Sequence, residues 1–242
     1  MTMTTKSTRF HERLKLKIPL QVVYHEANEE WTENTETEEL TICGIGFTLS
    51  RPVEPKRLIH LRLPMPKNLR LFDYGKEQYE VWGMIRYLQL VESNSPTQIR
   101  LMIGTAAIGG TAPASFQQNP NTLYELKPIL MKQSFWGLRE LPRTTGPYMR
   151  SSEERRSIKT NVILEIVNEE GKITEFIEAE TLNISESGMA VIAQVEFNQP
   201  KYVLVKNEST VLLAAVRGAA PVDSPNHTRL HFEFISGKWV FD

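Results

Sequence analysis

Short segments in which apolar and polar residues alternate are the feature that most limits how this chain can fold. Near the N-terminus every second residue is apolar: Leu14, Leu16, Ile18, Leu20 and Val22. Successive side chains of a strand point to opposite faces, so this pattern predicts a half-buried strand. Pro19 has no N–H to donate, and we expect it at an edge or where no ladder bond is needed.

Similar runs recur along the whole chain. They predict strands at Ile59–Leu63, Tyr79–Leu88, Ile99–Ile103, Val162–Val167, Ile173–Ile184, Met189–Val195, Lys201–Val205, Val211–Val216 and Arg229–Ile235. In the last run, one face carries Leu230, Phe232 and Phe234, and the other carries Arg229, His231 and Glu233. Many short strands separated by turns are typical of barrels or sandwiches, so we expect an all-β protein of two antiparallel barrels in tandem.

Helical periodicity is nearly absent. The best candidate helix is Thr122–Lys132, which Pro128 would interrupt after one or two turns. Gly104–Pro120 contains Gly-Gly and two prolines, and we interpret it as the exit from the first barrel. A second turn-rich stretch, Pro142–Ser152, is where we place the domain boundary, which gives domains of residues 1–141 and 142–242.

Composition excludes several classes of protein. The 242 residues suit two barrels of roughly 100 residues each. A net charge of -1 provides no global basic field for nucleic acid. The single cysteine, Cys43, cannot form an internal disulfide and fits a reducing cytoplasm. The polar N-terminus is no secretory signal, and no apolar run approaches the ~20 residues of a membrane helix, so we expect a cytoplasmic protein without membrane insertion.

The two halves carry the same parts in the same order. Each opens with a basic cluster that leads into a strand, Arg9–Arg13 and Arg155–Lys159, and each later has a glycine turn, Thr41–Gly46 and Asn183–Gly188. The step from the last basic residue to the turn is 28 positions in the first half and 24 in the second. Such matched order and spacing indicates a duplication.

The chemistry of these parts suits a ligand with phosphates and purine rings. Arginine binds phosphate with a planar fork and stacks on rings, whereas lysine offers only a point charge. The Asn183 amide can bond a purine edge, the Ser185 hydroxyl can donate or accept, and Gly188 permits close backbone approach. The alternatives are a solvated basic segment and an ordinary turn whose side chains cap their own backbone.

A basic RxxxR lead-in followed by [Asp/Asn]-x-Ser-x-x-Gly is the paired signature of PilZ domains, and the chain resembles that family over about Arg9–Ile108 and Arg155–Val240. The resemblance implies bacterial signalling proteins built of six-stranded antiparallel barrels that bind cyclic di-GMP. The arginines would wrap the phosphates and stack on guanine, and the Asn and Ser would contact guanine. A basic lead-in with a related barrel upstream also resembles the two-domain flagellar-brake arrangement.

Each half departs from that signature in a different way. The first keeps Arg9, Arg13 and Gly46, but Thr41 and Cys43 stand at the Asn and Ser positions. The second keeps the complete turn but has lysine at its second basic position. We therefore expect the ligand on the second unit, with these residues in the site: Arg155, Arg156, Lys159, Asn183, Ser185 and Gly188. The secondary candidate site comprises Arg9, Arg13, Thr41, Cys43 and Gly46.

Catalysis finds no support in the sequence. The five histidines form no HExxH pair, one cysteine excludes a Cys-based zinc site, and Ser185 lacks a Gly-x-Ser-x-Gly context. We expect no enzyme, metal or cofactor. The acidic clusters Glu29-Glu30 and Glu36–Glu39 are expected in a solvent-facing polar loop.

Three functions remain open. The first is a cyclic di-GMP effector whose interdomain arrangement changes on binding. The second is a degenerate PilZ adaptor that acts through a protein partner of unknown identity without binding the nucleotide. The third is an enzyme or a nucleic-acid binder on a similar barrel, which the charge and the missing catalytic groups disfavour.

Overall fold

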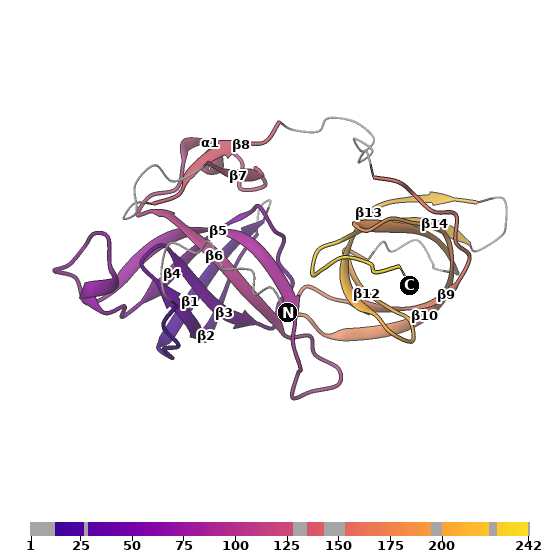
Figure 1. The fold of residues 1–242 in the computed structure, drawn as a ribbon, viewed down its shortest axis with the longest axis horizontal. Coiled ribbons are helices and arrows are strands. Elements are labelled where there is room, and N and C mark those ends of the chain that lie inside the picture. Colours follow the sequence, from indigo (N-terminus) through magenta and orange to yellow (C-terminus); the bar gives the residue numbers. More distant parts are fainter. Residues whose placement is uncertain are drawn as a thin grey trace, which may run out of the picture. The chain divides into compact units, whose positions relative to one another are not determined.

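Two closed barrels account for most of the strands (Figure 1). The computed structural model describes residues 13–26, 29–127, 135–142, 153–194, 200–222 and 227–241. The first barrel consists of β1 (Pro19–Glu26), β2 (Glu29–Thr41), β3 (Gly44–Leu49), β4 (Leu58–Leu63), β5 (Tyr79–Leu90) and β6 (Leu101–Gly109). The second consists of β9 (Asn161–Val167), β10 (Ile173–Ile184), β11 (Gly188–Ala193), β12 (Tyr202–Lys206), β13 (Val211–Pro221) and β14 (Thr228–Phe234).

Both barrels have the same strand order. Around the first barrel the strands run β1-β2-β3-β6-β5-β4, and around the second they run β9-β10-β11-β14-β13-β12. Numbered from its own first strand, each barrel therefore reads 1-2-3-6-5-4, and its strands pair antiparallel. The predicted all-β architecture of tandem antiparallel barrels is confirmed.

Alternation builds the cores as the sequence predicted. In β14, Leu230, Phe232 and Phe234 pack in the core of the second barrel, which leaves the residues between them on the outer face. Pro19 is the first residue of β1, where its missing N–H removes no ladder bond from the middle of the strand.

Two sequence-based interpretations of residues 104–127 are wrong. Tyr124–Lys127, expected in a helix, forms strand β7 paired with β8 (Gly137–Glu140). The short helix is instead α1 (Ala114–Gln118), which starts after Pro113; a 3-10 turn, η1, spans Lys67–Leu69. The expected barrel exit at Gly104 is also too early, because β6 continues to Gly109.

The acidic stretch after β1 is a strand and not a polar loop. Residues Glu29–Thr41 form β2, which pairs with β1 on one side and β3 on the other. Two paired neighbours satisfy its backbone, and Thr37 and Leu40 are fully buried while several glutamates face outward. Tertiary pairing therefore overrides the low strand propensity of glutamate.

The chain divides into two compact units that do not follow the two halves of the sequence. The first unit comprises Met1–Thr48, Lys56–Arg86 and Gly104–Arg143, and the second comprises Leu49–Pro55, Tyr87–Ile103 and Thr144–Asp242. The second unit thus contains the second barrel together with the loop after β3 and the tip of the β5–β6 hairpin. Among the helices of the described ranges, none has both the length and the apolar character needed to cross a membrane.

Hydrogen bonds hold these added segments within the second unit. The N–H of Ile99 donates to the Gly171 carbonyl at 2.9 Å, and the N–H of Ile173 donates to the Thr97 carbonyl at 2.9 Å. Gly171 has a φ of +78°, and a Cβ there would lie 1.8 Å from the Ser50 carbonyl oxygen. Only glycine fits both this conformation and this close approach.

Candidate functional site

The basic lead-in of the second barrel lies beside the end of β10. Arg156 and Ile184 exchange two backbone hydrogen bonds, of 2.8 and 2.9 Å. Four residues on, the N–H of Thr160 donates to Thr181 Oγ1 at 2.9 Å, and the N–H of Thr181 donates to the Thr160 carbonyl at 3.0 Å. This pairing brings the basic cluster next to the Asn183–Gly188 turn.

A carboxylate also joins the lead-in to this turn. Ser187 donates both its N–H and its hydroxyl to Glu153 Oε2, at 3.2 and 2.5 Å. The hydrogen bond from the Ser187 hydroxyl is the main cause that lowers the pKa of Glu153. The carboxylate is therefore ionised at neutral pH and fixes the start of the lead-in to the turn.

The three basic side chains have different surroundings. Arg155 is exposed. The Arg156 guanidinium lies 4.4 Å from the centre of the Phe241 ring, a cation–π contact that directs it to the C-terminal segment. Lys159 forms an exposed ion pair with Glu180 at 3.3 Å. Arg155 is thus the basic residue of the cluster best placed to meet a ligand.

Ser185 and Gly188 form the turn itself. The N–H and the hydroxyl of Ser185 both donate to the Gly188 carbonyl, at 2.8 and 3.2 Å, and Ser185 is buried. A Cβ at Gly188 would lie 2.3 Å from the Phe232 carbonyl oxygen. Asn183 differs from both, because it is only half-buried and its amide makes no hydrogen bond to another described residue.

Outward-facing residues of four strands align in two rows on this side of the barrel. Directly paired residues of neighbouring strands share a face. The first row runs across β10, β11, β14 and β13 and contains Asn183, Ala190, His231 and Gly218. The second row runs beside it and contains Glu180, Ile192, Arg229 and Ala220. The ion pair to Glu180 places Lys159 over this second row.

Two arginines, one on the second row and one on the lead-in, lie close enough to His231 to affect its ionisation. Burial lowers the pKa of His231, and the guanidinium groups of Arg229 and Arg155 lower it further, so these three side chains share one electrostatic environment. The Nε of Arg229 is buried and has no hydrogen-bond partner in the described part of the chain. The motif comparison missed Arg229 and His231, although the alternation in Arg229–Ile235 already placed both on the outer face.

Backbone pairing in the first barrel corrects the alignment of the two halves. Leu14 and Leu40 exchange two hydrogen bonds of 2.9 Å, as Arg156 and Ile184 do. Arg13 is therefore equivalent to Arg155. The sequence motifs had paired Arg13 with Lys159, so the structure shifts the alignment of the two basic segments by four residues.

The turn of the first barrel is displaced as well. Thr41 Oγ1 donates to the Gly44 carbonyl at 3.2 Å, as Ser185 does to Gly188. A strand irregularity between Thr37 and Glu39 likewise matches the one between Thr181 and Asn183. Glu39, and not Thr41, therefore stands at the Asn183 position; the sequence comparison chose Gly46 where the structure uses Gly44.

The secondary candidate residues do not form a comparable polar face. Glu39 forms an ion pair with Arg13, so a carboxylate occupies the position of the Asn183 amide. Cys43 and Gly46 are buried. The N–H of Ala107 donates to the Cys43 carbonyl, just as the N–H of Phe234 donates to the Ser187 carbonyl, so Ala107 is equivalent to Phe234. Counting back along both strands from this pair, Gly104 is equivalent to His231 and Met102 to Arg229. Arg9 lies outside the described residues.

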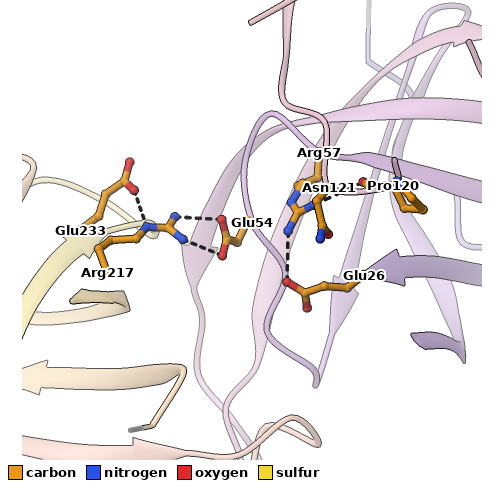
Figure 2. A network of polar contacts seen from close by, with 7 residues as sticks. All are labelled: Glu26, Glu54, Arg57, Pro120, Asn121, Arg217 and Glu233. Atoms are coloured by element: carbon orange, nitrogen blue, oxygen red, sulfur yellow. Dashed lines mark hydrogen bonds and ion pairs between the residues drawn. The ribbon is translucent and has the colours of Figure 1, made fainter. Parts of the chain in front are cut away.

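Two arginines, the buried Arg57 and the half-buried Arg217, bind carboxylates elsewhere in the molecule (Figure 2). In the second unit, Arg217 on β13 binds both oxygens of Glu54, at 2.9 and 2.8 Å, and Glu233 at 2.8 Å. Burial opposes its charge, but the hydrogen bonds and charges of these glutamates raise the pKa of Arg217 above its ordinary value. Arg217 is thereby occupied by protein groups. In the first unit, Arg57 binds Glu26 at 3.1 Å and Asn121 at 2.6 Å.

Comparison with known proteins gives matches among solved structures only. No family model and no curated protein matches the chain. PlzA of Borreliella burgdorferi in complex with cyclic di-GMP is 9% identical, with 91% of this chain and 81% of that chain covered and a TM-score of 0.29. The inhibitor of motility MotI/DgrA of Bacillus subtilis is 12% identical, with 91% and 88% covered and a TM-score of 0.27.

YcgR from Escherichia coli in complex with cyclic di-GMP is 12% identical, with 90% of this chain and 75% of that chain covered and a TM-score of 0.26. Two of these three neighbours, PlzA and YcgR, are complexes with cyclic di-GMP. At such identities and TM-scores the likenesses assign no ligand to this chain.

Proposed function

We propose that this chain is a cyclic di-GMP effector and that its second barrel binds the nucleotide. The observation that carries the proposal is the position of Arg155 and Lys159 beside Asn183 on one outer face. A dianionic ligand with flat bases needs fixed positive charge and a polar group that can bond a base edge, and this face supplies both. Arg156, Ser185 and Gly188 would support the site by holding the lead-in and the turn in place.

Ligand binding would favour the conformations in which the lead-in and the barrel face lie together. A ligand shifts a conformational equilibrium only by its difference in affinity for the two states. A nucleotide that contacts Arg155 on the lead-in and Asn183 on β10 has such a difference, because only the paired arrangement offers both groups. We therefore propose that binding changes the interdomain arrangement, which small-angle scattering with and without ligand would detect.

Calorimetry of the full chain with cyclic di-GMP tests the function directly. We expect one site per chain, weakened by Asn183→Ala by about five- to a hundredfold, the effect of one lost hydrogen bond. Thr41→Ala is the matched control, because its hydroxyl closes the turn of the first barrel. Absence of heat and of ligand-induced stabilisation in the unsubstituted chain would overturn the proposal.

One observation favours a second function, that of a degenerate adaptor. The Ser185 hydroxyl is already used within its own turn, and Lys159 is already paired with Glu180. A face so occupied can contact a protein partner of unknown identity without any nucleotide. A chain that binds no cyclic di-GMP yet loses a cellular phenotype on Asn183→Ala would support this function.

A further inference from the structure

His231 stands opposite Asn183 across the proposed site. In the first row of outward-facing residues, Ala190 pairs with Asn183 on one side and with His231 on the other. Neighbouring strands lie about 4.8 Å apart, so the backbones of Asn183 and His231 are separated by about 10 Å. Ala190 is buried beneath its neighbours, which leaves the amide and the imidazole as the polar groups that rise above this row.

On the side of His231 that faces β13, the paired residue has no side chain. His231 pairs with Gly218 on β13, at a strand irregularity between Val216 and Gly218. A Cβ at Gly218 would lie 3.9 Å from His231 Cδ2, in ordinary contact with the ring. Glycine at this position therefore leaves the edge of the imidazole uncovered. The half-buried ring is held in position by the strand yet is accessible from outside.

The chemistry of this histidine suits a base better than a phosphate. Burial and the guanidinium groups of Arg229 and Arg155 lower the pKa of His231, so the ring is neutral at physiological pH. A neutral imidazole has one donor and one acceptor, and guanine presents acceptors at O6 and N7. The positive charge that phosphates need is already supplied by Arg155 and Lys159 in the proposed site.

We infer that His231 is a further ligand-binding residue, which contacts a guanine edge from β14 while Asn183 holds the nucleotide from β10. This inference rests on the proposed function of the second barrel. It adds strand β14 as a fourth element of the site, because the lead-in, β10 and the turn already contribute to it. Neither motif of the sequence contains this residue.

Calorimetry with cyclic di-GMP at pH 8, where the imidazole is neutral, tests the inference. We expect His231→Ala to weaken binding about five- to a hundredfold, the effect of a lost hydrogen bond, and His231→Gln to recover part of the loss. The salt dependence should stay that of the unsubstituted chain, because no charge is removed. His227→Ala is the matched control, since it removes an imidazole four residues away, outside the row.

The outcomes separate the two proposals. Binding by the unsubstituted chain that His231→Ala leaves unchanged would overturn the role of His231 alone. If the affinity of His231→Ala depended less on salt than that of the unsubstituted chain, His231 would contact the ligand as a charged group. That result would overturn the inferred contact between the neutral imidazole and a guanine edge. No binding by the unsubstituted chain would overturn the proposed function and this inference together. Melting temperatures of all variants would show whether a loss reflects unfolding.

Discussion

The two barrels share a strand order but present different chemistry at equivalent positions. Where the second barrel has Asn183, the first has Glu39, and Glu39 is bound to Arg13, the equivalent of Arg155. Where the second has His231 and Arg229, the first has Gly104 and Met102. The two barrels thus share a strand order and a hydrogen-bonded turn, while the outer faces carry different residues. The first barrel satisfies its own arginine with a carboxylate, whereas the second leaves Arg155 exposed.

Exchanging the two residues at the central position should have the largest effect. Asn183→Glu removes the amide and places a carboxylate beside Arg155. The negative charge of this carboxylate would repel the phosphates of the ligand. We expect the affinity for cyclic di-GMP, measured by calorimetry, to fall by at least about a hundredfold. Glu39→Asn is the reciprocal control and should leave it unchanged. A loss caused by Glu39→Asn, with Asn183→Glu neutral, would assign the ligand to the first barrel.

The equivalent turn glycines should differ in how badly they tolerate a methyl group. A Cβ at Gly188 would lie 2.3 Å from the Phe232 carbonyl oxygen, whereas a Cβ at Gly44 would lie 2.9 Å from that of Thr105. Overpacking of this kind costs about 1–3 kcal/mol, and we expect the larger loss of stability for Gly188→Ala. Calorimetric melting and hydrogen exchange in β11 and β14 measure it. Equal losses in both variants would contradict the difference in packing.

Of the two equivalent lead-in arginines, only the one on the second barrel should affect the affinity for cyclic di-GMP when it is removed. Arg155→Ala should weaken cyclic di-GMP binding about tenfold, because a charge-assisted hydrogen bond is lost. The difference should shrink in high salt, where exposed charges are screened. Arg13→Ala should leave affinity unchanged, since Arg13 is paired with Glu39. If both variants weaken binding, a double-mutant cycle between Arg13 and Asn183 would test for a composite site.

The smallest expected effect is a loss of stability in both barrels on mild acidification. Burial lowers the pKa of His60 in the first barrel and of His231 in the second, below the value of 6.5 of the free side chain. The unfolded chain then binds more protons, so stability is full above pH 6.5 and is lost as the pH falls through the folded values. Melting curves between pH 8 and pH 5 would show it. His60→Gln should remove the contribution of the first barrel, and an unchanged pH profile would contradict it.

The sequence predicted the architecture because alternation is a local signal. Runs such as Ile173–Ile184 became strands with those bounds, and the outer position of His231 followed from its neighbours. The acidic strand β2 escaped detection because its stability comes from two paired neighbours distant in the sequence. The alignment of the first turn failed because Gly44 and Gly46 stand two residues apart, and only hydrogen bonds distinguish them.

The sequence predicted part of the candidate site, as it predicted part of the fold. Sequence spacing alone grouped Arg155 with Asn183. It could not reveal that the Ser185 hydroxyl already donates a hydrogen bond to the Gly188 carbonyl within its own turn. It also could not place His231 beside them, because that requires the register of β14 against β11.

The composition of the second unit has a consequence for how this gene could have evolved. A freshly duplicated module can be copied, moved or lost alone, because everything that it needs lies within its own stretch of sequence. Here Glu54, encoded in the first half, neutralises Arg217 of the second, and the Ser50 carbonyl oxygen lies so close to Gly171 that no side chain could fit there. A break between residues 141 and 142 would separate Glu54 from Arg217 and Ser50 from Gly171, so the second barrel would lose contacts that the first half of the sequence supplies.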